Sequence, residues 1–169
     1  MAENKLGQTL FNQDFLGDSK LYQASVLEQY KLFIASAENI SNRRQTANAF
    51  FVTINTALVS FHSYFSSMQT SIEFKFWLVS ITGIIISYMW FRLVTSYKDL
   101  NSAKFAVIQE IEAKLPLNPY KAEWERLKST NAAKPYRPFT QIEAWLPWVF
   151  IFIHLAVLSM SFYGKLFAQ

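Results

Sequence analysis

The stretch WLPWVFIFIHLAVLSMSFYG, residues 145–164, contains no charged side chain. It belongs to a charge-free run of 21 residues between Glu143 and Lys165, which is long enough for a helix to cross the hydrocarbon core of a bilayer. A soluble helix of this length keeps a stripe of charged residues, and this run keeps none. We therefore predict a transmembrane helix over residues 144–164, with Trp145 and Trp148 at the membrane interface.

Two further charge-free runs lie earlier in the chain. One has 28 residues and begins after Arg44, and the other has 16 residues between Lys75 and Arg92. The second is short, but long basic side chains at its ends can extend to the lipid headgroups. The two runs predict transmembrane helices over residues 47–66 and 74–95.

The composition agrees with a membrane protein. Of the 169 residues, 51% are hydrophobic and only 17% are charged, whereas a soluble domain carries about 25% charged residues. Trp77 and Trp90 bracket the second predicted span, as interfacial aromatic residues do. The sequence contains no Cys, which excludes disulfides, thiolate metal sites and a catalytic thiol.

Lysine and arginine predict the orientation in the membrane. Fourteen of them lie before the first span or in the stretch from Arg92 to Arg137, and the other two are Lys75 and Lys165. Because basic residues favour the cytoplasmic side, we expect a cytoplasmic N-terminus and a periplasmic C-terminus. The first 25 residues lack the apolar stretch that a signal peptide needs, so we expect no cleavable signal peptide.

The segments outside the spans also have helical patterns. Apolar residues at spacings of three and four over residues 19–46 predict an amphipathic cytoplasmic helix that continues into the first span. Residues 1–18 form an N-terminal arm. Residues 96–143 are expected to form a cytoplasmic helical hairpin and loop.

Proline and capping residues set the expected helix ends. Pro116 should stop the helix that leaves the second span, and Pro119 should open a short helix after Asn118 as N-cap. Thr140 and Glu143 have the spacing of a capping box, which would start the third helix there. Pro147 then lies inside that helix and predicts a kink.

Polar residues recur at intervals of seven along the first span. Because seven residues are nearly two helical turns, they form one stripe, which should face protein or water because lipid offers no hydrogen bonds. The stripe either makes interhelical hydrogen bonds that set the register of an oligomer, which we favour, or lines an aqueous pore. The oligomer and helix-packing candidates are Ser41, Asn48, Asn55 and His62, with Thr56 beside them, and the small-residue face Ser80, Gly83 and Ser87 of the second span.

His154 lies near the middle of the third predicted span. A charged imidazole is costly at that depth, so we expect a neutral ring with its donor and acceptor both partnered. Candidate partners are Asn55 or Thr56 on the first span and Ser80 or Ser87 on the second. The residue is either structural or a pH-responsive switch of the assembly.

Motifs of the common catalytic and cofactor sites are missing from the sequence. It contains no GxxxxGK[ST], GxGxxG, HExxH or GxSxG, and its two His residues have no carboxylate at metal-ligand spacing. We therefore predict no catalytic residues, no cofactor and no metal. The nine basic residues between Arg92 and Arg137 fit positive-inside charge on cytoplasmic helices better than a nucleic-acid site.

Two stretches resemble a known family. Residues 40–60, ISNRRQTANAFFVTINTALVS, and residues 97–127 are similar to the RipA-like, or octameric, membrane proteins, which are small bacterial inner-membrane proteins. The motif residues are Arg43, Arg44, Asn101, Lys104, Phe105, Glu112, Pro116, Pro119 and Trp124, together with Asn48 and Asn55 of the stripe.

The resemblance implies a homo-octamer in the bacterial cytoplasmic membrane and a role linked to intracellular proliferation. It implies no catalytic residue. We therefore expect an all-α integral membrane protein with three transmembrane helices and a cytoplasmic helical region, assembled as a homo-oligomeric ring. Its expected partners are further copies of itself and the lipid bilayer. The expected function is a non-enzymatic scaffold in envelope or stress physiology, with a channel or pore-forming effector as the alternative and an intramembrane enzyme as the second.

Overall fold

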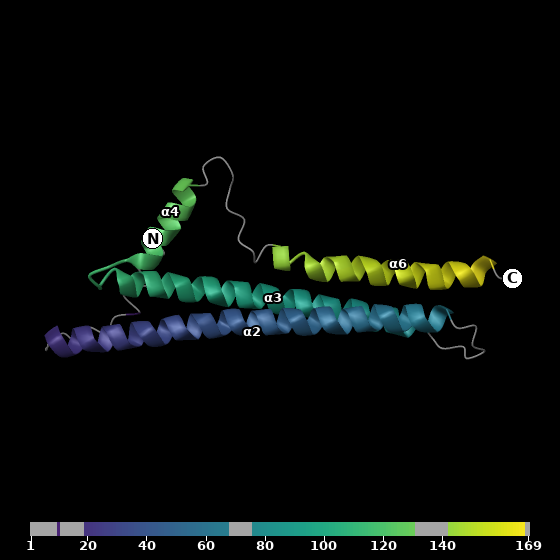
Figure 1. The fold of residues 1–169 in the computed structure, drawn as a ribbon, viewed down its shortest axis with the longest axis horizontal. Coiled ribbons are helices and arrows are strands. Elements are labelled where there is room, and N and C mark those ends of the chain that lie inside the picture. The colour runs from purple at the N-terminus through teal and green to yellow at the C-terminus, as the bar shows by residue number, and fades with distance from the viewer. Residues whose placement is uncertain (1–9, 11–18, 68–75, 131–141, 168–169) are drawn as a thin grey trace. The chain divides into compact units, whose positions relative to one another are not determined.

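The chain is described here by a computed structural model, which covers residue 10 and residues 19–67, 76–130 and 142–167 (Figure 1). Across these ranges the elements are helices, and the all-helical prediction is confirmed for them. The predicted arm over residues 1–18 lies outside them apart from residue 10. The helices are α2, Ser19–Ser67; α3, Phe76–Glu112; α4, Pro119–Thr130; and α6, Leu146–Phe167.

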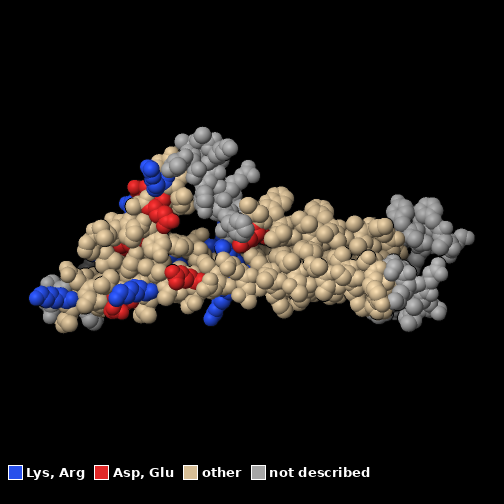
Figure 2. All heavy atoms as spheres, in the orientation of Figure 1, with Lys and Arg blue, Asp and Glu red and all other residues tan. Residues whose placement is uncertain are grey.

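The chain divides into two compact units, and α2 and α3 each contribute residues to both. Unit 1 consists of Met1–Asn42 and Lys98–Arg137, and unit 2 consists of Arg43–Tyr97 and Pro138–Gln169. α2 continues unbroken from the predicted amphipathic segment into the first charge-free run. Figure 2 shows charged side chains on unit 1 and almost none over most of unit 2.

Unit 2 packs the second part of α2, the first part of α3 and α6 around an aromatic core. Trp90 is fully buried, and its ring stacks on Phe51 of α2 with 5.8 Å between centroids. On its other side it contacts Phe150 of α6 at 6.1 Å. The prediction that Trp90 is an interfacial anchor is therefore wrong, because its indole lies inside the helix bundle. Trp77 and Trp145 are at least one third exposed.

The start of α6 also differs from the prediction. Ile142 and Glu143 are helical, a turn follows at Ala144, and α6 begins at Leu146. Pro147 therefore occupies the first turn of α6, where its missing N–H breaks no helical hydrogen bond, and the helical run is interrupted at Ala144 and Trp145 just before it. Thr140 lies outside the described residues, so the predicted capping box of Thr140 and Glu143 stays a prediction.

Length and hydropathy identify one described helix as a candidate membrane span, Trp77–Glu112, which overlaps residues 77–95 of the second predicted span. The apolar stretch Leu146–Ser161 of α6 is shorter. The side chains beyond Ser161 are outside the described set, so the structure shows only part of the 21-residue run seen in the sequence.

Unit 1 packs the first part of α2, the last part of α3 and α4. Ala37, Ile108 and Ile111 are buried between them. α3 ends at Glu112, four residues before Pro116. The turn that follows tightens, with the Leu115 N–H donating to the Glu112 carbonyl at 2.9 Å, because the residue before a proline avoids the helical conformation. α4 begins at Pro119, as predicted.

The carboxylate of Glu112 holds unit 1 together. Its side chain is fully buried and accepts hydrogen bonds from the Tyr30 hydroxyl at 2.7 Å and from the backbone N–H groups of Tyr120 at 3.1 Å and Lys121 at 3.3 Å. These N–H groups belong to the first turn of α4, which has no helical acceptors for them. Glu112 thus caps α4 with a negative charge at its positive end and ties it to α2.

The hydroxyl groups of Tyr30 and Tyr120 stay neutral at physiological pH. Burial raises the pKa of the Tyr30 hydroxyl above its ordinary value of 10, and the hydrogen bond to the Glu112 carboxylate raises it further. Burial also raises the pKa of Tyr120, with the negative charges of Glu38 and Glu112 adding to the effect. The ring of Tyr120 also packs edge-on against Phe105 at 5.6 Å.

We predict that Glu112→Leu releases α4 from unit 1, because three donors lose their only acceptor in a buried site. The loss should lower the free energy of unfolding of unit 1 by about 3 kcal/mol, the order expected for hydrogen bonds to a charged group. Hydrogen exchange at the amides of Tyr120 and Lys121 measures it directly.

Glu112→Gln is the matched control, because it keeps one acceptor oxygen and should lose only part of the protection. Unchanged exchange at both amides in the leucine variant would show that Glu112 does not hold α4.

Candidate functional site

The surface of unit 2 is apolar where a soluble protein would be polar. The described parts of its helices over residues 45–65, 77–91 and 146–161 carry no charged residue. Phe50, Phe152 and Met160 are 56%, 66% and 75% exposed. Further exposed apolar side chains of this unit are Phe61, Leu78, Ile81, Ile85, Met89, Val149, Ile153 and Leu155.

The largest polar side chains in the middle of unit 2 lie inside. Asn48 is 9% exposed, and its Oδ1 accepts a hydrogen bond of 2.8 Å from the indole N–H of Trp90. This bond joins α2 to α3 and satisfies the donor that a buried tryptophan must place. The same bond explains why the Trp90 ring can lie inside the bundle, because Asn48 of α2 provides an acceptor directly opposite its N–H.

A second polar cluster joins all three helices of unit 2 about two turns further along α2. Asn55 is fully buried, and its Oδ1 accepts a hydrogen bond of 2.8 Å from the hydroxyl of Ser87 on α3. Nε2 of His154 on α6 lies 3.2 Å from the same oxygen. The Asn55 amide nitrogen donates to the Phe51 carbonyl at 2.8 Å, which fixes the orientation of the amide.

This arrangement fixes the hydrogen on the imidazole. An amide oxygen only accepts hydrogen bonds, so Nε2 of His154 must carry the hydrogen in its contact with Asn55. In the neutral ring Nδ1 is then the acceptor. The sequence analysis named Asn55 and Ser87 as candidate partners of His154, and the structure brings all three together.

Gly83 provides the space for the imidazole. A Cβ atom built at this position would overlap the ring of His154, with Nε2, Cε1 and Cδ2 as the nearest atoms. Any larger side chain at residue 83 would therefore push α6 away from α3. At Gly83, the small-residue face predicted on the second span thus contacts the His154 side chain of the same chain.

The other candidates of the stripe are placed differently. Ser80 is 1% exposed, and within the described residues its hydroxyl has no hydrogen-bond partner. Thr56 is exposed, and His62 is half-buried. Ser41 is half-buried and belongs to unit 1. The bonds of Asn48 and Asn55 lie within one chain, so they do not bear on contacts between copies.

An ion pair lies at the end of unit 2 where α6 begins. Nε of Arg44 is 3.1 Å from Oε2 of Glu143, and the two side chains are 13% and 8% exposed. The angles between them do not make a linear hydrogen bond, so the attraction is mainly that of the two charges. Sequence analysis assigned Glu143 to a capping box and did not find its pairing with Arg44. Arg43 beside it is exposed.

The remaining motif residues lie in unit 1. The Lys104 ammonium donates to the Ser36 hydroxyl at 2.8 Å and lies 5.0 Å above the ring of Phe33. Asn101 is half-buried, and Trp124 is 43% exposed on α4. These contacts stabilise helix packing, and among the described residues there is no group of His, Asp or Glu that could hold a metal.

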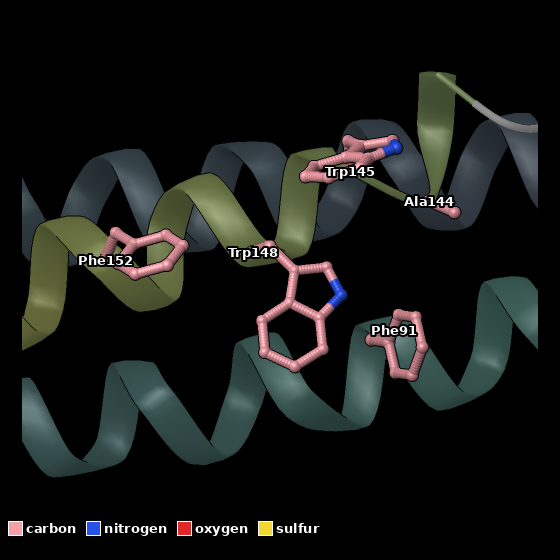
Figure 3. Close-up of a pocket in the computed structure, with 5 residues that line it drawn as sticks. All are labelled: Phe91, Ala144, Trp145, Trp148 and Phe152. Atoms are coloured by element: carbon pink, nitrogen blue, oxygen red, sulfur yellow. The ribbon is translucent and has the colours of Figure 1, made fainter.

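An apolar groove of about 360 Å³ lies on unit 2 between α3 and the start of α6. Figure 3 shows Trp148 and Phe152 on α6 and Trp145 in the turn before it, with Phe91 on the neighbouring α3. The rings of Phe91 and Trp148 meet edge to face at 5.4 Å. Ala144 completes the lining. Sequence analysis did not find this groove, because its walls come from residues more than fifty positions apart.

We predict that Gly83→Ala destabilises unit 2 by about 1–3 kcal/mol, the usual effect of forcing a methyl group into a packed core. The thermal unfolding of the purified protein in mild detergent measures this effect. Combining it with His154→Ala, which removes the overlapping ring, should recover part of the loss. Strictly additive effects of the two substitutions would contradict the contact.

We also predict opposite outcomes for two buried serines of α3. Ser87→Ala removes the donor to Asn55 and should lower stability by about 0.6 kcal/mol, as is typical of hydrogen bonds within membranes. Ser80→Ala removes a buried hydroxyl that has no partner and should be neutral or stabilising. The same unfolding measurement compares them, and a larger loss for Ser80→Ala would refute the assignment.

Comparison with known proteins places this architecture in a family. The family model described as the octameric membrane protein family matches residues 27–163, which include most of both units. Neither the curated proteins nor the solved structures gave a match. The name of the family describes membrane proteins that form octamers, which agrees with the apolar surface of unit 2. The chain belongs to the octameric membrane protein family.

Proposed function

We propose that this protein is a non-enzymatic scaffold of the bacterial inner membrane, built as a homo-oligomeric ring of three-span protomers. In this proposal unit 2 is the membrane-spanning part and unit 1 is the cytoplasmic part. We take the number of copies in the ring, eight, from the name of the family. The scaffold would support envelope or stress physiology, including growth inside host cells as the RipA resemblance implies.

The reversed polarity of unit 2 is the observation that carries the proposal. Many of its exposed side chains are large and apolar, whereas Asn48, Asn55 and His154 are turned inward and make contacts between its helices. Water would favour the opposite arrangement, whereas hydrocarbon requires this one because it offers no hydrogen bonds.

The hydrogen-bonding pattern favours a scaffold over a pore through the protomer. The Asn55 oxygen is already shared by Ser87 and His154, and the Asn48 oxygen is used by Trp90. A water-filled path needs polar groups that remain available to water along its length. A conducting path would therefore have to run between copies.

Charge supports the orientation. The positive-inside imbalance of fourteen basic residues against two favours a cytoplasmic unit 1 and a periplasmic C-terminus. The Arg44–Glu143 pair and the exposed Arg43 and Arg92 then lie near the cytoplasmic headgroups, where basic side chains interact favourably with anionic lipid.

Three measurements test the proposal. A phosphatase fused after Gln169 should be active in the periplasm, and one inserted at Asn131 should be inactive. The detergent-purified protein should have a native mass of about eight times the 19.6 kDa chain. Liposomes containing it should show no ion flux above that of empty liposomes.

A monomer in detergent and in native membranes would contradict the ring. Equal phosphatase activity of both fusions would contradict the orientation. Ion flux that depends on protein concentration would favour the channel alternative over the scaffold.

A further inference from the structure

The groove of unit 2 is open, and its lining is mostly apolar. Three residues that line it are partly open to the outside: Trp145 is 71% exposed, Phe152 is 66% exposed and Trp148 is 41% exposed. Its volume of about 360 Å³ lies within the range of sites that bury a ligand group. Three aromatic side chains spread over the first turns of α6 and the turn before it form a hole suited to a flat apolar side chain.

A tier of aromatic rings extends from this groove across the unit to α2. Phe91 neighbours Trp90, Trp90 stacks on Phe51, and Phe51 meets Phe50 edge to face at 5.5 Å. Because an α-helix rises 1.5 Å per residue, Phe50 and the centre of the groove lie within about 5 Å of one another along the helix axes.

The symmetry of a membrane ring makes this common depth significant. Copies inserted with one topology are related by rotation about an axis perpendicular to the membrane, and such a rotation keeps every residue at its own depth. A residue that fills the groove from a neighbouring copy must therefore come from the same tier. It must also lie on another face, because a closed ring needs head-to-tail contacts between two different patches.

Phe50 meets both conditions. It is 56% exposed, and it lies on α2, which contributes no residue to the groove. Tyr88 and Met89 are also exposed at this level, but they lie on α3, which forms one wall of the groove. Phe50 is held by its contact with Phe51, so little side-chain freedom is lost when it binds.

We infer that the groove of each protomer binds the Phe50 ring of the neighbouring copy, so that the site is complete only in the assembly. The inference rests on the ring proposed above and assigns its interface. The ring of Phe50 would enter between Phe91 and Phe152 and pack against Trp148. No hydrogen bond is needed, because association within hydrocarbon depends on close van der Waals packing.

Cysteine cross-linking between two differently tagged chains tests this interface, and the absence of native Cys removes any background. One chain carries Phe50→Cys and the other carries Phe152→Cys or Ala144→Cys, both at the groove. A short bifunctional maleimide applied to native membranes should join the two chains into a dimer that carries both tags.

Met160→Cys is the matched control for the second chain. Met160 is 75% exposed on the same helix but lies eight residues beyond Phe152, about 12 Å away in depth. We expect at least tenfold less two-tag dimer with this variant. A lysine-reactive cross-linker on the same membranes should give a ladder of oligomers for every pair.

The outcomes separate the interface from the ring. A ladder without a preference for the groove pairs would overturn the role of Phe50 and leave lipid or another segment in the groove. The lack of any ladder would overturn the ring itself. In the Cys-free protein, Phe50→Ala should reduce the fraction of the full assembly in detergent, whereas Phe61→Ala, on the same helix at another depth, should not.

Discussion

The carboxamide of Asn55 is fully buried and finds its hydrogen bonds inside one chain, as a buried polar group must. Its oxygen accepts from Ser87 on α3 and faces Nε2 of His154 on α6, while its nitrogen bonds to its own helix. These contacts set the relative height of all three helices. They also require the imidazole to lie directly against α3, which only glycine at position 83 permits.

Unit 1 meets a related requirement with a charge. Glu112 is as deeply buried as Asn55, but its carboxylate is surrounded by the Tyr30 hydroxyl and by two N–H groups at the start of α4. A buried charge is tolerated when several donors satisfy it. In both units, therefore, a single buried acceptor gathers donors from separate helices and determines how they pack.

Periodicity in the sequence revealed which residues face inward but not which residues they meet. The seven-residue spacing placed Asn48 and Asn55 on one stripe, and the structure buries both. The interfacial placement of Trp90 failed because hydropathy does not show that Asn48 offers an acceptor at the same depth.

Helix ends show the same limit. Proline at position 119 marked the start of α4 correctly, because proline at the first helical position is a local preference. The cap supplied by Glu112 and the partner of Glu143 were not found, because both depend on how the chain turns back on itself. Local signals thus predicted elements, and contacts between distant residues determined their exact ends and partners.

Because Asn48, Asn55 and His154 of unit 2 make their contacts within the protomer, these side chains have few hydrogen bonds left to offer a neighbour. Contacts between copies in the membrane must then depend on shape, and the exposed aromatic and branched side chains supply that shape. The number of copies in a closed ring is set by the angle between the two contacting faces of one protomer. In the interface proposed here, that angle would depend on how α2 and the α3–α6 groove are arranged around the buried Asn55 cluster, so the interior polar contacts would control the assembly indirectly.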